Sequence, residues 1–165
     1  MASDGNETEN SYPYRGKSKR LKGYDYSRPG PYFVTIHARV HEPVFEIPRL
    51  HAILYETWQA LPQRFPGVKL DAFVVMPDHI HGVLWLPSVS TGCSSPAPTL
   101  SRVIGAYKSL TAVAWIRACD ANGLQGFGSF WQDDFYDCII PNTVALQRIR
   151  HYIRHNPAAL ENREG

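Results

Sequence analysis

Cysteine is scarce in this chain of 165 residues, which contains three cysteines with wide spacing between them. Cys93, Cys119 and Cys138 are odd in number and form no CxxC pair, so the sequence offers neither a disulfide framework nor a zinc knuckle. We therefore expect free thiols, as is usual for proteins of the reducing cytosol.

Long apolar runs are also missing. No segment approaches the roughly 20 apolar residues of a membrane-spanning helix, and residues 1–16 are polar and lack the apolar stretch of a secretory signal. We therefore expect a cytoplasmic protein. Length and composition are typical of one globular domain, which we place at residues 21–160, between a flexible, basic and polar leader (1–20) and a short tail (161–165).

A strong net charge is absent too, because the formal charge is only +2. The basic residues are nevertheless unevenly distributed: residues 15–22 hold five of them and no acid, and three arginines lie close together near residue 150. Such patches favour a polyanion such as nucleic acid, although an ordinary solvated face would have the same composition. The residues are Arg15, Lys17, Lys19, Arg20 and Lys22 in the first group and Arg148, Arg150 and Arg154 in the second.

The periodicity of apolar residues predicts seven elements. Strands are expected at 31–40, 68–76, 79–86 and 131–140, and helices at 49–64, 99–119 and 143–156, the last one capped by Asn142 and ended by Pro157. The two middle strands are too close in sequence for a crossover and should form an antiparallel hairpin. The order β-α-β-β-α-β plus a helix predicts an α+β, ferredoxin-like fold, with one antiparallel sheet, helices on one face and an additional C-terminal helix.

Two histidines, His79 and His81, lie one residue apart in the apolar segment MPDHIHGVLWL (76–86). Residues i and i+2 of a strand point to the same face, so the two imidazoles should stand side by side. Two neutral imidazoles can chelate one divalent cation if a further ligand is near. A core strand whose histidines merely find hydrogen-bond partners would show the same pattern.

The last predicted helix carries a second pair of polar residues. Tyr152 and Asn156 are four residues apart and therefore share a face of the helix. The amide oxygen of Asn156 is a suitable ligand for Mg²⁺ or Mn²⁺, and the phenol of Tyr152 is a possible nucleophile. A tyrosine half-buried against the sheet is the alternative interpretation.

Taken together, several segments of the chain resemble the REP-associated tyrosine transposases, IS200-like members of the HUH single-tyrosine transposase superfamily. The resemblance spans about residues 15–160, and the segments follow the order found in the family. They are RLKGYDYSRPGPYFVTI, LDAFVVMPDHIHGVLWLP, PTLSRVIGAYKSLTAVAWIR, FWQDDFYDCIIPN and RIRHYIRHNP.

The resemblance implies the chemistry of the site. His79 and His81 match the HUH motif and would bind Mg²⁺ or Mn²⁺, Tyr152 would be the nucleophile, and Asn156 would be the third metal ligand. The family's reaction is the cleavage and rejoining of single-stranded DNA near hairpins formed by repetitive extragenic palindromes. It proceeds through a 5′-phosphotyrosine and a free 3′-hydroxyl, so no nucleotide cofactor is needed. Association with the nucleoid would follow.

DNA would be the partner, bound by a monomer or a homodimer. The basic residues named above, together with Lys108, would contact phosphates, and exposed aromatic side chains would stack on unpaired bases. The aromatic residues concerned are Tyr24, Tyr26 and Trp131.

Two positions depart from the family pattern. Asp78 stands where relatives often have Asn, and Cys138 where they often have His. Tyr136 is a competing nucleophile, but it lacks an amide at helical spacing. A second possible function is that of a hairpin-DNA-binding protein that retains the fold without the catalysis.

Overall fold

The computed structural model describes residues 25–40, 42–88, 96–123 and 129–161, with side chains up to Asn156. The five basic residues predicted between Arg15 and Lys22, together with Tyr24 and Cys93, lie outside these ranges.

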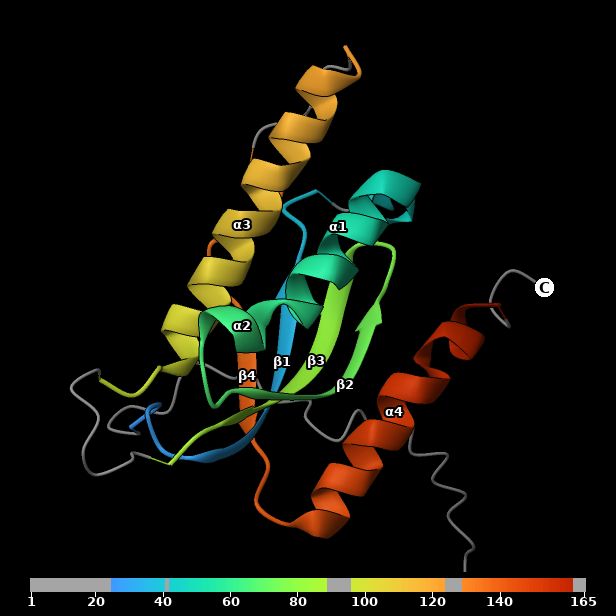
Figure 1. The fold of residues 1–165 in the computed structure, drawn as a ribbon. Helices are drawn as coiled ribbons and strands as arrows, with labels where there is room; N and C mark the ends of the chain where they lie inside the picture. Colours follow the sequence, from blue (N-terminus) through green and yellow to red (C-terminus); the bar gives the residue numbers. More distant parts are fainter. Residues whose placement is uncertain (1–24, 41, 89–95, 124–128, 162–165) are drawn as a thin grey trace, which may run out of the picture.

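One four-stranded sheet forms the centre of the structure (Figure 1). Its strands are β1 (Gly30–His37), β2 (Lys69–Val75), β3 (His79–Leu86) and β4 (Tyr136–Ile139), in the spatial order β2-β3-β1-β4. Every neighbouring pair is antiparallel, which confirms the predicted β2–β3 hairpin. The α+β class with one antiparallel sheet is likewise confirmed.

The helices are α1 (Pro48–Gln59), α2 (Leu61–Arg64), α3 (Leu100–Ala121) and α4 (Thr143–Glu161), and a 3₁₀ turn, η1 (Val44–Glu46), precedes α1. The single helix predicted at 49–64 is divided in two because Pro62 has no N–H to donate to the preceding turn. Thr99 and Asn142 cap α3 and α4 through side-chain oxygens that accept backbone N–H groups at 3.2 Å and 2.9 Å.

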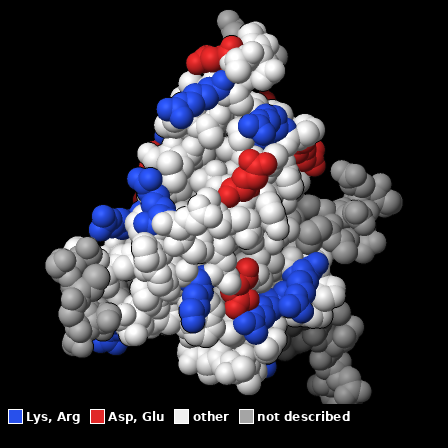
Figure 2. All heavy atoms as spheres, viewed as in Figure 1, with Lys and Arg blue, Asp and Glu red and all other residues white. Residues whose placement is uncertain are grey.

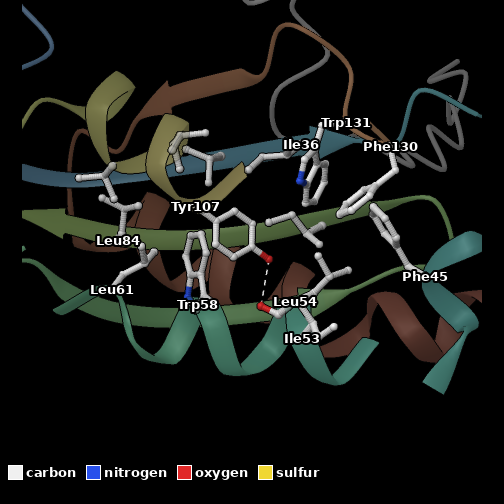
Figure 3. Close-up of a cluster of buried hydrophobic side chains, with 14 of the residues drawn as sticks. Ile36, Phe45, Ile53, Leu54, Trp58, Leu61, Leu84, Tyr107, Phe130 and Trp131 are labelled. Atoms are coloured by element: carbon white, nitrogen blue, oxygen red, sulfur yellow. Dashed lines mark hydrogen bonds between the residues drawn. The ribbon is translucent and has the colours of Figure 1, made fainter. Parts of the chain in front are cut away.

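The two faces of the sheet support two separate cores. Alternate residues of β1, such as Tyr32, Val34 and Ile36, pack with α1 and α3 in the larger core. Figure 3 shows part of it, including the hydrogen bond from the Tyr107 hydroxyl to the Leu54 carbonyl at 3.0 Å. The intervening Phe33 packs instead with Leu146, Ile149 and Ile153 of α4 in a smaller core, so α4 covers the opposite face.

Gly82 of β3 allows α1 to approach the sheet closely. A Cβ atom at this position would lie 2.5 Å from the ring of Trp58, and Trp58 is fully buried and stacked on Phe73. A side chain here would push α1 off the sheet, and this explains a glycine in the middle of an otherwise apolar strand.

Three predictions about the C-terminal third of the chain are wrong. The helix α4 continues through Pro157 to Glu161, since a proline costs a helix one hydrogen bond and a kink but does not always end it. The last strand is only four residues long. Trp131 is not an exposed base-stacking residue: it is 3% exposed in the larger core, and its indole N–H donates to the Thr111 hydroxyl at 2.9 Å.

Candidate functional site

The two histidines begin β3 and point toward the α4 side of the sheet. His81 is 3% exposed, whereas His79 is half-buried. Their Nε2 atoms face one another at 3.1 Å, and the ring centroids are 4.6 Å apart. Two imidazole nitrogens that bind one divalent cation are separated by roughly 3 Å. The strand geometry therefore provides two nitrogen ligands at the spacing of a metal site.

Each imidazole is also held by a hydrogen bond at its other ring nitrogen, Nδ1. The Nδ1–H of His79 donates to the Asp78 carboxylate at 2.6 Å, and Nδ1 of His81 is hydrogen-bonded to the Thr35 hydroxyl at 2.8 Å. Thr35 lies directly opposite His81 in the β1–β3 register. Partners of this kind fix the ring of a metal-binding histidine and raise its basicity. Asp78, noted above as a departure from the family pattern, thus takes an orienting role.

Burial keeps His81 neutral. It lowers the pKa of the imidazole from 6.5 to about 3, with further lowering by the nearby His79 and His37. A neutral imidazole retains the lone pair that a metal ligand needs at physiological pH.

We expect this shifted pKa to be visible in acid unfolding of the metal-free protein. Between pH 6.5 and about 3 the unfolded chain binds a proton at His81 that the folded chain does not, so the stability contribution is complete above pH 6.5 and is lost as the pH falls. The loss is at most about 1.4 kcal/mol per pH unit. The free energy of unfolding, measured with urea in the presence of EDTA, should therefore depend less steeply on pH in His81→Phe than in the wild type. Equal slopes would contradict the assignment.

Tyr152 reaches this histidine pair from α4. Its hydroxyl lies 3.5 Å from Nε2 of His81, and the two ring centroids are 5.4 Å apart. Phe33 of β1 supports both rings: it stacks on His81 at 5.5 Å and meets Tyr152 edge-on at 6.4 Å. The structure therefore brings Tyr152 next to a histidine pair from which it is separated by more than 70 positions in the sequence.

Asn156 is half-buried on α4, one helical turn beyond Tyr152. Among the residues that the structure describes, no group of three or more His, Cys, Asp or Glu side chains is placed to hold a metal ion. The role of Asn156 as an additional, oxygen ligand stays a prediction.

Sequence reasoning missed His37. The imidazole stacks on His79 at 5.1 Å, because the two residues are directly opposite one another in β1 and β3. The alternation of β1 places His37 on the same face as Phe33 and Thr35, but only the strand register could have placed it beside His79. Tyr136, 48% exposed, meets the far side of His37 edge-on at 5.6 Å. Tyr136 is thus separated from the histidine pair by a further ring, whereas Tyr152 contacts it directly.

Cys138 packs at the margin of the smaller core, opposite Phe33 in the sheet. Burial, with a contribution from Asp137, raises the pKa of its thiol to about 11. A thiol that stays protonated at neutral pH is a poor nucleophile.

The predicted phosphate-binding residues have different surroundings. Arg148 and Arg154 are exposed on α4, and Figure 2 shows Lys and Arg side chains on the α4 part of this face. Lys108 is half-buried on α3 and donates to the carbonyl oxygens of Gln132 and Asp133 at 2.5 Å and 2.9 Å, and burial lowers its pKa. Arg150 is paired with Asp71. Of these four, Arg148 and Arg154 are the most accessible to a nucleic acid.

Comparison with known proteins adds three findings. The family model described as "Transposase IS200 like" matches residues 42–156, a range that includes both histidines and Tyr152 and ends at Asn156. An uncharacterized protein of Haemophilus influenzae is 27% identical over an alignment of 167 positions that covers 88% of this chain and 89% of the relative.

The third finding concerns the fold. The solved structure of a REP-associated tyrosine transposase bound to a REP hairpin superposes with a TM-score of 0.59 at 23% identity, covering 82% of this chain and 71% of the other. The two proteins therefore share a fold. Within the described residues, no helix of this chain is long and apolar enough to cross a membrane.

Proposed function

Because the chain belongs to the family of IS200-like transposases, we propose that it cleaves and rejoins single-stranded DNA at hairpin-forming palindromic repeats, with Tyr152 as the nucleophile. The observation that carries this proposal is the contact between the Tyr152 hydroxyl and the His79–His81 pair, at 3.5 Å from Nε2 of His81. A phenol beside two converging imidazoles is the arrangement that metal-assisted attack on a phosphodiester requires.

The proposed metal is Mg²⁺ or Mn²⁺. The donor set fits it, because the Nε2 atoms of His79 and His81 converge while both Nδ1 atoms are occupied by Asp78 and Thr35. Asn156 would supply an oxygen ligand of the kind these cations prefer. When bound, such a cation polarises and orients the scissile phosphodiester.

The protein's own residues would then perform the transfer. Phe33 meets the ring of Tyr152 edge-on, and the phenol oxygen lies near Nε2 of His81. The phenol releases its proton to solvent, its oxygen forms a bond to phosphorus, the bond from phosphorus to the 3′ oxygen breaks, and the leaving 3′ oxygen takes up a proton from solvent. The products are a 5′-phosphotyrosine and a free 3′-hydroxyl, which can later attack the phosphotyrosine in the reverse sense. Bond energy is conserved, and no nucleotide cofactor is required.

The proposed substrate is single-stranded DNA with a hairpin. The solved relative with the same fold is bound to a REP hairpin, and the exposed Arg148 lies four residues before Tyr152, on the same side of α4. A phosphate contact from Arg148 would hold the strand beside the nucleophile, and the exposed Arg154, on another side of the helix, would contact a different phosphate.

The test is adduct formation. We expect the protein with Mn²⁺ to form a covalent adduct, visible on a denaturing gel, with an oligonucleotide that carries a palindromic hairpin and randomised single-stranded arms. Sequencing the trapped strands would identify the cleavage site. A blunt duplex of the same sequence should give none. Binding of the hairpin without any adduct would contradict the proposal and favour a DNA-binding protein without catalysis.

A further inference from the structure

Arg150 lies on α4 two residues before Tyr152 and is bonded to the sheet through two nitrogens. Its Nε donates to Asp71 Oδ1 at 2.7 Å and its Nη2 to Oδ2 at 2.5 Å. The Asp71 carboxylate also accepts the indole N–H of Trp85 at 3.2 Å and the backbone N–H of Ala72 at 2.8 Å. The side chains are only 26% and 13% exposed. This is a bidentate pair in a shielded position, which is more directional than a surface ion pair.

A bulge in β2 lies next to the Asp71 carboxylate. The register of β2 against β3 shifts by one residue between Leu70 and Phe73. Leu70 and Phe73 both pack with the larger core, whereas Ala72 packs with the smaller core under α4. The extra residue therefore leaves Asp71 and Ala72 together on the α4 side, at no cost to the packing of Phe73. Bulges commonly redirect a side chain beside a functional site in this way.

Besides this pair and the contact of the Tyr152 hydroxyl with His81, α4 packs on the sheet through apolar side chains. Leu146, Ile149 and Ile153 form a stripe over the smaller core, and such contacts resist separation but restrict sliding and rotation of a helix only weakly. The bidentate pair is directional, and it lies less than one helical turn from the nucleophile.

Building on the proposed function, we propose that Asp71 and Arg150 are positioning residues: their ion pair fixes α4 on the sheet so that the Tyr152 hydroxyl meets His81. In this role Arg150 affects the rate of strand transfer and not the affinity for DNA. Its place in a basic cluster of the sequence instead predicts a contact with phosphate. A displacement of a reacting group by about 1 Å can cost roughly 100-fold in rate.

The two roles of Arg150 predict opposite effects at Asp71. If Arg150 contacted phosphate, Asp71→Asn would release the guanidinium and remove a repelling charge, so DNA would bind more tightly. If the pair positions α4, Asp71→Asn leaves the dissociation constant for DNA unchanged and lowers the rate of adduct formation at saturating DNA. Arg150→Lys should act in the same way, because a lysine keeps the charge but cannot form the two parallel hydrogen bonds.

The experiment measures both quantities on a hairpin oligonucleotide with Mn²⁺. We expect Asp71→Asn and Arg150→Lys to slow single-turnover adduct formation by about 10- to 100-fold, with dissociation constants within about twofold of the wild type. Arg148→Ala should instead weaken DNA binding. The salt dependence of the binding constant should fall by the amount expected for the loss of about one phosphate contact. Arg117→Ala on the exposed surface of α3 is the neutral control. Tighter binding by Asp71→Asn, or an unchanged rate, would overturn the inference.

A second readout needs no catalysis and keeps this inference distinct from the proposed function. Amide hydrogen exchange should be faster along α4 in Asp71→Asn and Arg150→Lys, while α1 and α3 keep their protection. Unchanged protection of α4 in both variants would overturn the inference even in an active enzyme. Absence of an adduct in the wild type would contradict the proposed function alone, and the exchange data would still decide whether the pair holds α4.

Discussion

Replacing Tyr152 with phenylalanine should abolish the covalent protein–DNA adduct while leaving the fold and DNA binding intact. Phenylalanine retains the ring that meets Phe33 and His81 and removes only the hydroxyl. The lost contact with His81, at 3.5 Å, is a long hydrogen bond of small energy. Loss of the nucleophile should lower the rate by at least about 10³-fold, as measured from adduct on denaturing gels.

Tyr136→Phe is the matched control for this substitution. Tyr136 is the competing nucleophile, on the same face of the sheet but beyond His37, and it is exposed enough to tolerate the change. We expect Tyr136→Phe to form the adduct at a rate within about threefold of the wild type, since no bond to the reacting phosphate is removed. An adduct that survives Tyr152→Phe and disappears in Tyr136→Phe would reverse the assignment.

Removal of the proposed metal, or of one of its proposed histidine ligands, should have an effect of similar size. The Nε2 atoms of His79 and His81 are the nitrogen ligands that we propose for the cation, so EDTA or His79→Ala should reduce adduct formation by at least about 10³-fold. His79 is half-buried, and its loss disturbs the core less than the loss of His81 would. The measurement is the rate of adduct formation as a function of Mn²⁺ concentration.

Asp78→Asn supplies an intermediate case. An asparagine can still accept a hydrogen bond from His79 but carries no charge, so we expect about 10- to 100-fold weaker activation by Mn²⁺ with the same maximal rate at saturating metal. Full activity of His79→Ala in EDTA would exclude the metal site, and an unchanged response of Asp78→Asn would remove the orienting role of the carboxylate.

Much of this arrangement could be predicted from the sequence because it depends on local periodicity. The alternation around His79 and His81 places both imidazoles on one face, and the spacing of Tyr152 and Asn156 places them on one side of a helix. The hairpin follows from the short connection between β2 and β3, which is three residues long in the structure. These relations involve residues close together in the chain, where backbone geometry determines which side chains share a face.

The contacts that complete the site depend on long-range register and could not be predicted. Thr35 meets His81 and His37 meets His79 only because β1 pairs with β3 in one register. The sequence places Arg150 among the phosphate-binding residues because its partner, Asp71, lies 79 positions away at a bulge that leaves no clear signal in the sequence. It predicts an exposed Trp131 because a tryptophan beside polar residues has the same local pattern in a core and on a surface.

The central claim is that Tyr152 becomes covalently joined to DNA, and mass spectrometry of the trypsin-digested adduct tests it most directly. Cleavage after arginine places Tyr152 in the peptide 151–154 and Tyr136 in the separate peptide 118–148, so the two candidates are resolved by mass alone. We predict a 5′-phosphonucleotide on the tyrosine of peptide 151–154. Its presence on peptide 118–148, or on neither peptide, would contradict the account.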